Sequence, residues 1–168
     1  MIRVSAFRSR IPWVALATAT VAVLSACANV YPDAVTVRAL VCEECVNGEY
    51  DSVTVRGNSA IPQLLRAMSG PGTARELTVR NTAMGSWARL SAFDTSFHLA
   101  DSTEIGNRTA ARFRASWQAR AMLLLRKIGT PEAKWALRAG LTAIPVNRRY
   151  SLGPSLRAFG DSLYRDFP

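Results

Sequence analysis

The chain has little of the residue types that carry most enzyme chemistry. Its 168 residues include three cysteines and one histidine, His98, so a four-ligand zinc site has only one imidazole to draw on. No glycine-rich phosphate loop follows a strand pattern, and no Gly-x-Ser-x-Gly elbow is present. No polar–apolar alternation is sustained, so a β-sheet is not expected. We therefore predict no catalytic, cofactor-binding or metal-binding residues and a protein that is not an enzyme.

Lysine is also scarce, because only Lys127 and Lys134 stand among 21 basic residues and all the others are arginine. The formal net charge is +9, and 49% of the residues are hydrophobic, so the chain is not a disordered tail. Such a charge suits a surface that meets anionic lipid, glycan or an acidic protein. The alternative is a solvated basic face with no dedicated ligand.

One apolar run stands near the amino terminus. Three arginines, at positions 3, 8 and 10, precede apolar residues 11–24, a stretch of 14 residues. A spanning helix needs roughly 20. A basic head, a short apolar core and small residues before a cleavage point are typical of an export signal. No second long apolar run follows, so we expect the mature protein to be anchored to a membrane without spanning it.

Residues 24–27, Leu-Ser-Ala-Cys, resemble a bacterial lipobox. The resemblance implies that residues 1–26 are removed as a signal peptide and that Cys27 carries a diacylglycerol as the first mature residue. The alternative is an ordinary signal cleaved after Ala26 or Ala28. In enterobacterial lipoproteins an Asp after the cysteine favours retention in the inner membrane. Ala28 therefore favours the periplasmic face of the outer membrane.

Processing changes the size and the charge. Removal of residues 1–26 from the 168 leaves 142, which suits one domain with a real core. The three lost arginines reduce 21 basic residues to 18 against 12 acidic ones, so the net charge falls to +6. We interpret residues 27–34 as the lipidated cysteine and a tether, and residues 35–168 as one helical domain. Export argues against nucleic acid as a partner.

Two further cysteines, Cys42 and Cys45, form a Cys-x-x-Cys pair. An even number of thiols in an oxidising compartment favours a structural disulfide between them. A helix end at this point would tolerate the distortion that the bond requires. Free or redox-active thiols are the alternative, although no thioredoxin-like strand pattern accompanies the pair. Haem attachment would need a histidine after Cys45, where Val46 stands.

The pattern from Ala34 onward is helical. The clearest stripe has the spacing i, i+4, i+8, i+11 and i+15 over residues 107–128: Phe113, Trp117, Ala121, Leu124 and Ile128. Gly129 then suits the left-handed position that ends a helix, and Thr130 with Pro131 suits the start of the next. Further helices are expected over about 48–56, 61–68, 73–97, 131–141 and from about 153. The stripe of the 73–97 helix is Val79, Ala83, Trp87 and Leu90.

Two hairpins, near 48–68 and 108–141, resemble HEAT-type repeats. Residues 120–141 hold a leucine-rich helix end, then Gly-Thr-Pro-Glu-Ala, then Ala-Leu, and residues 57–68 place Gly, Ala and Pro before paired leucines. The hairpins lie about 70 residues apart, close to twice a repeat of roughly 40. The resemblance implies an all-α fold, a short HEAT- or armadillo-like α-solenoid of antiparallel hairpins. The alternative is a compact helical bundle.

One group of polar residues is a further candidate for a site. Asp94, His98 and Asp101 would share one helix face if the helix persisted, and could then hold a metal or a general base. The alternative is a polar helix end.

Trp135 lies off the stripe of its helix between Lys134 and Arg138, as an interface anchor would. The alternative is that Trp135 packs against the next helix.

These features lead to three hypotheses for function. The first is a non-enzymatic, membrane-tethered scaffold or adaptor that docks an envelope protein, as the repeat resemblance implies. The second is an accessory protein that binds anionic lipid or glycan through an arginine-rich face. The third is a small thiol redox protein that uses Cys42 and Cys45, or an enzyme centred on Asp94 and His98. Fold alone does not decide among them.

Overall fold

A computed structural model of the chain describes residues 31–41, 48–94, 101–147 and 149–168. Every regular element in these ranges is a helix, which confirms the all-α prediction. The signal peptide and the candidate residues Cys27, Cys42, Cys45 and His98 lie outside them. The elements are α2 (Ala34–Val41), α3 (Gly48–Thr54), the 3₁₀ helix η1 (Gly57–Ala60), α4 (Ile61–Ala67), α5 (Thr73–Phe93), α6 (Ser102–Ile128), α7 (Pro131–Leu141) and α8 (Gly153–Arg165).

The longest helix, α6, has defined ends. Asp101 caps its amino terminus by accepting a hydrogen bond from the backbone N–H of Thr103, at 2.9 Å. Gly129 ends it at φ 73°, a left-handed conformation that favours glycine. Thr130 then caps α7 by accepting from the N–H of Ala133, at 3.2 Å. The predicted tight hairpin between the two helices is confirmed, although α6 begins five residues earlier than the apolar stripe indicated.

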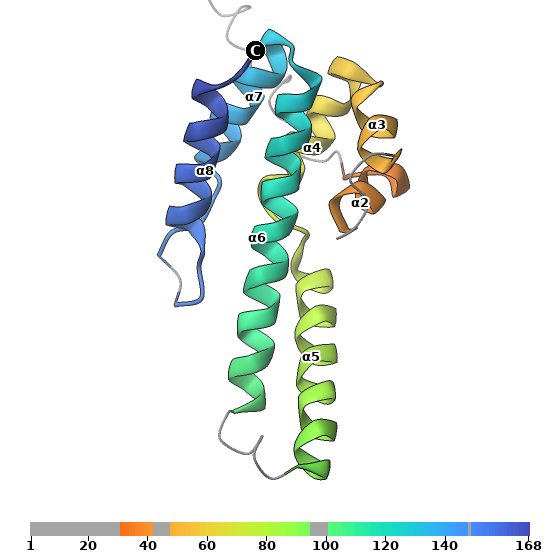
Figure 1. The fold of residues 1–168 in the computed structure, drawn as a ribbon, viewed down its shortest axis with the longest axis vertical. Coiled ribbons are helices and arrows are strands. Elements are labelled where there is room, and N and C mark those ends of the chain that lie inside the picture. Colours follow the sequence, from red (N-terminus) through yellow and green to blue (C-terminus); the bar gives the residue numbers. More distant parts are fainter. Residues whose placement is uncertain (1–30, 42–47, 95–100, 148) are drawn as a thin grey trace, which may run out of the picture. The chain divides into compact units, whose positions relative to one another are not determined.

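The core lies around the carboxyl-terminal half of α6. There α6 is flanked by α7 and α8 on one side and by α2, α3 and α4 on the other (Figure 1). The stripe that predicted this helix lies inside: Trp117, Ala121 and Leu124 are fully or almost fully buried. Buried residues of the neighbouring helices close the core around them: Leu40, Val53, Leu64, Met68, Ala133, Ala136, Leu137, Leu156 and Leu163.

Hydrogen bonds from α6 attach the amino-terminal helices. The buried Gln118 side chain donates to the carbonyl of Met68, at 2.8 Å, at the end of α4. Arg120 donates to the carbonyl of Leu40, at 2.8 Å, in α2. Because a carbonyl at a helix end has no partner within its own helix, each bond satisfies a group that would otherwise lie buried and unpaired.

Close contacts join α7 to its neighbours. A side chain at Gly140 would place its Cβ 2.3 Å from the sulfur of Met68, so α7 lies close to the end of α4 and a larger residue at position 140 would displace the Met68 side chain. At Gly160 of α8 a Cβ would lie 2.3 Å from Leu141. Helix α8 begins at Gly153, as the sequence predicted, and Leu152 just before it is 45% exposed.

Helix α5 lies antiparallel to the amino-terminal half of α6 (Figure 1). It has no buried residue, so the stripe expected to fill a core is only partly covered, and Leu90 is 50% exposed. Helix α5 meets α6 at Gly106, where a Cβ would lie 2.5 Å from Met84 and 3.1 Å from the carbonyl oxygen of Arg80. We call α5 with the amino-terminal half of α6 the arm.

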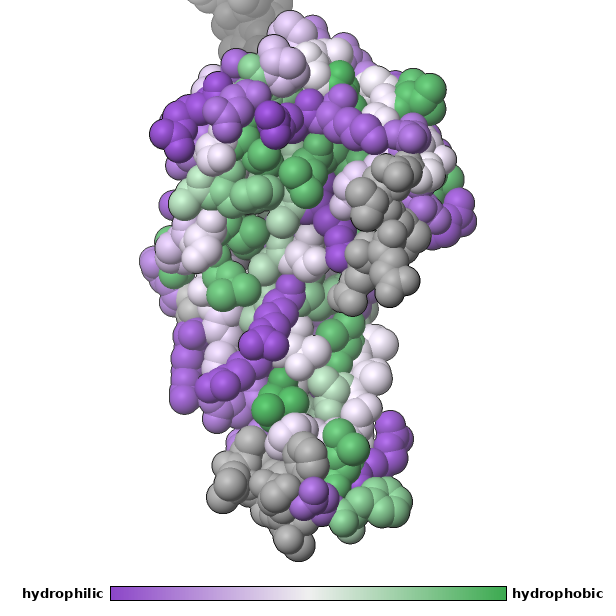
Figure 2. All heavy atoms as spheres, viewed as in Figure 1, coloured by the Kyte–Doolittle hydropathy of each residue, from purple (hydrophilic) through white to green (hydrophobic). Residues whose placement is uncertain are grey.

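The core and the arm also differ at the surface. Figure 2 shows hydrophobic residues gathered over the part where α6 meets α8, with a hydrophilic border above them, whereas hydrophobic and hydrophilic residues are interspersed over the arm. Within the described ranges, no helix combines the length and the apolar character needed to cross a bilayer.

Candidate functional site

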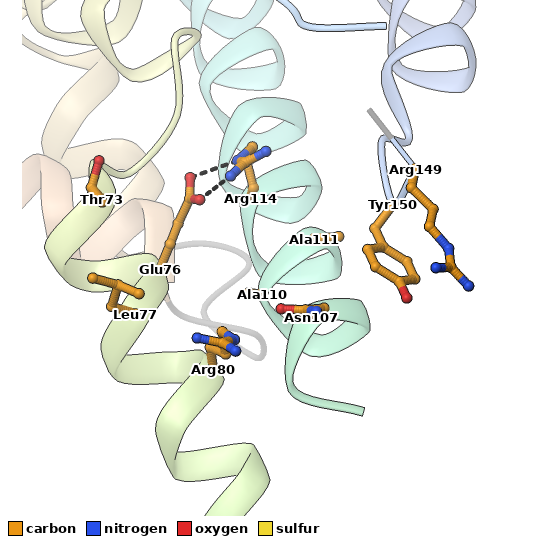
Figure 3. Close-up of a pocket in the computed structure, with 10 residues that line it drawn as sticks. All are labelled: Thr73, Glu76, Leu77, Arg80, Asn107, Ala110, Ala111, Arg114, Arg149 and Tyr150. Atoms are coloured by element: carbon orange, nitrogen blue, oxygen red, sulfur yellow. Dashed lines mark hydrogen bonds and ion pairs between the residues drawn. The ribbon is translucent and has the colours of Figure 1, made fainter. Parts of the chain in front are cut away.

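A cavity of about 230 Å³ opens at the arm (Figure 3). Four residues of α5, four of α6 and two of the segment before α8 line it: Thr73, Glu76, Leu77, Arg80, Asn107, Ala110, Ala111, Arg114, Arg149 and Tyr150. Three of these side chains are cationic and one is anionic. We call this space the arginine cavity, because it gathers positive charge that far-separated parts of the chain contribute.

One carboxylate and one guanidinium of the cavity are bound to each other. Arg114 donates to both carboxylate oxygens of Glu76; the bond from its Nε is 2.6 Å long. The two side chains are only 22% and 17% exposed. These hydrogen bonds raise the pKa of Arg114 above its ordinary value, and burial acts in the opposite direction. Both carboxylate oxygens of Glu76 thus face one arginine, in the bidentate geometry that makes such pairs strong.

Arg80 has no such partner. It follows Glu76 by four positions on α5, the spacing at which the two would pair on one helix face, but Glu76 is turned towards Arg114 (Figure 3). The Nε atom of Arg80 is buried and has no hydrogen-bond partner among the described residues. A buried donor without a partner costs about 1–3 kcal/mol. Within the described ranges no carboxylate pairs with Arg80, so its charge is uncompensated there.

The rest of the cavity wall is mostly apolar. Leu77, Ala110 and Ala111 contribute aliphatic surface, and the ring of Tyr150 stands opposite α5 (Figure 3). Arg149 lies at the edge farthest from α5, with its guanidinium carbon 5.3 Å from the centroid of the Tyr150 ring. The cavity thus combines one inner cation, one cation at its rim, an apolar lining and the polar side chains of Thr73 and Asn107.

A second surface surrounds Trp135 on α7. Trp135 is 64% exposed, so it does not pack into α8, which was the alternative considered for this residue. Lys134 lies over the rings of Tyr164 and Phe167, at 5.3 and 5.5 Å, and Arg138 lies 5.5 Å from the Tyr164 ring. We call these residues the Trp135 surface.

Contacts between α7 and α8 fix the charged side chains of the Trp135 surface. Besides its contact with Tyr164, Arg138 donates to Asp161, at 2.8 Å. Cations held over aromatic faces gain about 0.5–1 kcal/mol at exposed sites and lose some rotamer freedom. The tryptophan is thus flanked by two cations that are already positioned in the free protein.

A second hollow, of about 350 Å³, lies beside Tyr31, and we call it the Tyr31 groove. Arg66 lies 5.3 Å from the exposed Tyr31 ring, and Arg75 lies 5.2 Å from the ring of Trp117. The indole N–H of Trp117 is buried without a partner among the described residues. Two cations therefore line the Tyr31 groove.

The acidic pair considered for a metal does not share a helix face. Helix α5 ends at Phe93, and the backbone of Asp94 is extended, at φ −138° and ψ 115°. Asp101 belongs to the next helix, which it caps. The premise of a continuous helix from 94 to 101 is wrong, because the Asp94 backbone already leaves the helical conformation. Among the described residues, no group of three or more His, Cys, Asp or Glu side chains could hold a metal ion.

Sequence reasoning did not single out the arginine cavity. The i, i+4 spacing of Glu76 and Arg80 on one helix was a visible signal, but it predicts that these two pair with each other. Only the packing of α5 on α6 shows that Arg114, 38 positions further along the chain, takes the carboxylate instead. The Trp135 surface, in contrast, was visible because tryptophan departed from the apolar stripe.

Comparisons with known proteins give no match. A scan against protein-family models finds no match, and searches of the curated proteins and of the solved structures find no similar chain.

Proposed function

We propose that the protein is a lipid-anchored adaptor of the bacterial envelope that docks another envelope protein through the Trp135 surface. The single observation that supports this role best is the 64% exposure of Trp135 between two cations that already rest on the Tyr164 ring of α8. Tryptophan and arginine are the residues most enriched among those that dominate binding energy at interfaces. Among the described residues nothing covers most of the Trp135 ring, so a partner can reach it.

Anchoring is the part of the proposal that rests on sequence. Its support is the lipobox-like run of residues 24–27, which ends at Cys27. Intact mass spectrometry of the protein from bacterial membranes tests it directly. We expect cleavage before Cys27 and the added mass of a diacylglycerol, lost in Cys27→Ser. A mature chain that begins at Cys27 or Asn29 without added mass would contradict the anchor.

Docking is tested by site-specific photocrosslinking in intact envelopes. A photoreactive residue at position 135 should give one or a few discrete protein adducts that mass spectrometry can identify. Phe93 is the matched control, because it is an aromatic residue on another helix and is 92% exposed. The same adducts from position 93 would show that they arise from general exposure.

A variant completes the test of docking. Because the Trp135 side chain is largely exposed, Trp135→Ala should leave the melting temperature within about 1–2 °C, which corresponds to a surface change of under about 0.5 kcal/mol. The same variant should abolish the adduct formed by a photoreactive residue at the neighbouring position 138. Retention of that adduct would contradict a docking role for Trp135.

The Tyr31 groove favours one alternative, an accessory protein that binds anionic lipid. Four residues span at most about 14 Å, so acylation of Cys27 would hold Tyr31 and the nearby Arg66 within reach of lipid headgroups. Each basic residue near an anionic membrane surface contributes about 1 kcal/mol. The acylated protein should then bind vesicles containing phosphatidylglycerol more tightly than phosphatidylcholine vesicles. The preference should fall with salt and in Arg66→Gln, but not in Arg89→Gln.

For the arrangement of the helices, we propose the compact bundle over the HEAT-like solenoid. Within the described ranges α6 contacts all six other α-helices, whereas in a solenoid each repeat contacts only its neighbours. Truncation before Gly153, which removes α8, separates the two. In a bundle it removes the cooperative unfolding transition, because α8 covers the same central helix as the other elements. A shorter chain that still unfolds cooperatively would favour the solenoid.

A further inference from the structure

We infer that the arginine cavity binds a small organic carboxylate: one negative charge that carries a short apolar group. Three features of the cavity lead to this ligand class: the uncompensated Arg80, the closed Glu76–Arg114 pair and the apolar wall. The inference concerns a different surface from the proposed adaptor role and does not depend on the lipid on Cys27.

Arg80 supplies the attraction for the charge. Its buried Nε has no partner, and a guanidinium offers Nε–H and a terminal N–H side by side, in the geometry that matches the two oxygens of a carboxylate. A bound carboxylate would neutralise the cation, and a small turn of the Arg80 side chain would bring the orphaned Nε–H to it. Glu76 is not the partner at this position, because both of its carboxylate oxygens accept hydrogen bonds from Arg114.

The cavity favours a single charge. Glu76 lies one helical turn from Arg80, so a second negative charge on the ligand would be placed near a carboxylate, and like charges at this spacing repel. The other unpaired cation, Arg149, is exposed at the rim, where solvent screens it. A monoanionic carboxylate therefore fits the inner site better than a dianionic phosphate.

The lining favours an apolar group on the ligand. Leu77, Ala110 and Ala111 present no hydrogen-bonding side chains, and the Tyr150 ring adds a flat face (Figure 3). The volume of about 230 Å³ exceeds the roughly 30 Å³ that one water molecule occupies in the liquid, so an organic group can enter. Each methylene buried there contributes about 0.8 kcal/mol, or roughly fourfold in affinity.

Calorimetric titration of the full chain in zwitterionic nanodiscs tests the inference. The probes are butanoate and hexanoate, with hexanamide and hexyl phosphate as matched controls. We expect hexanoate to bind more tightly than butanoate, and at least about tenfold more tightly than hexanamide, since a hydrogen bond to a charged group contributes about 1.5–3 kcal/mol. No binding of hexanoate, or equal binding of hexanamide, overturns the inference. Tighter binding of hexyl phosphate overturns the choice of a single charge.

Three variants locate the binding site. Arg80→Gln should weaken hexanoate binding about tenfold or more, and Ala111→Phe should weaken it by filling the cavity without a change in charge. Arg89→Gln is the control, because Arg89 is an exposed arginine of the same helix that contacts Ser86, outside the cavity lining. Thermal melting establishes that each variant is folded. Hexanoate binding that survives both cavity variants, or that falls equally in Arg89→Gln, would contradict this location.

Discussion

The two halves of α6 lie in contrasting surroundings. Its carboxyl-terminal half is enclosed by helices on several sides, and Met122, Leu124 and Leu125 are completely buried there. Its amino-terminal half packs along α5, in which none of 21 residues is buried. One continuous helix thus passes from a closed core into an arm with partly covered faces.

The comparison shows that helix length and apolar spacing do not by themselves make a core. A helix needs neighbours on enough sides to remove its apolar stripe from water, and a single antiparallel pair leaves much of each stripe exposed. The arm instead depends on specific local contacts, namely the close approach at Gly106 and the Glu76–Arg114 pair. Local opening is accordingly expected at lower free energy in the arm than in the core.

The largest effect should come from truncating a core leucine. Leu137 of α7 is completely buried. Leu137→Ala should lower the free energy of unfolding by about 2–5 kcal/mol, because the free energy gained by burying the removed atoms is lost and a cavity is left in their place. The matched change in the arm, Leu77→Ala, removes a side chain that is 46% exposed, and should cost under about 1 kcal/mol. Urea unfolding followed by circular dichroism measures both. Equal costs would remove the distinction between core and arm.

Two glycines of the arm provide the next test. At Gly106 a Cβ would lie 3.1 Å from a backbone oxygen, which cannot move as a side chain can, whereas at Gly85 a Cβ would meet nothing within 4 Å. Gly85→Ala should stabilise by about 0.5–1 kcal/mol through its better helix propensity. Gly106→Ala should be less stable than Gly85→Ala by about 1–3 kcal/mol, the usual cost of overpacking.

Hydrogen exchange shows where the Gly106→Ala change acts. The amides of α5 should exchange faster in this variant, while those of α7 should keep their protection. Faster exchange throughout both helices would mean that the arm and the core open together as one cooperative unit.

Much of the fold was predictable because its signals are local. The Gly129–Thr130–Pro131 turn fixed the end of one helix and the start of the next by backbone conformation and capping, which depend only on neighbouring residues. The end of α5 was not predictable, since no cap or glycine marks Phe93. Nor did periodicity predict that Leu90 would remain half exposed, because the number of neighbours around a helix is a tertiary property.

The candidate sites divide in the same way. Trp135 was recognisable because a single residue departed from the stripe of its own helix. Arg80 and Arg114 were not, since the sequence offers each of them several carboxylates, and only the register of α5 against α6 assigns Glu76 to Arg114. A cation left without a partner is recognised only after every nearby carboxylate has been assigned.

The Glu76–Arg114 pair should contribute measurably to the arm. Glu76→Gln should cost about 1–2 kcal/mol, between the values for exposed and for fully buried pairs. The exposed pair of Arg108 with Glu104, at 2.6 Å on the same arm, is the control, and Glu104→Gln should cost under about 0.5 kcal/mol. The cost of Glu76→Gln should also fall less with added salt. Equal costs would mean that partial burial adds nothing to this pair.

The smallest effect concerns Asp33, which caps α2 outside the arm. The pKa of Asp33 lies well below its ordinary 3.8, mainly because its carboxylate accepts a hydrogen bond from the N–H of Thr36, at 2.9 Å. Burial raises this pKa, but the Arg56 side chain, 2.6 Å away, lowers it further. The folded state therefore binds fewer protons here than the unfolded state, so the Asp33 contribution is fully present above about pH 4 and is lost as the pH falls below it. Asp33→Ala should cost about 1 kcal/mol at pH 7, as the loss of a helix cap does, and less in acid. Asp33→Asn, which keeps a capping side chain but loses the charge, should cost less at pH 7 and should also weaken the acid dependence. A cost for Asp33→Ala that is the same at pH 7 and in acid would show that the charge of this carboxylate does not stabilise α2.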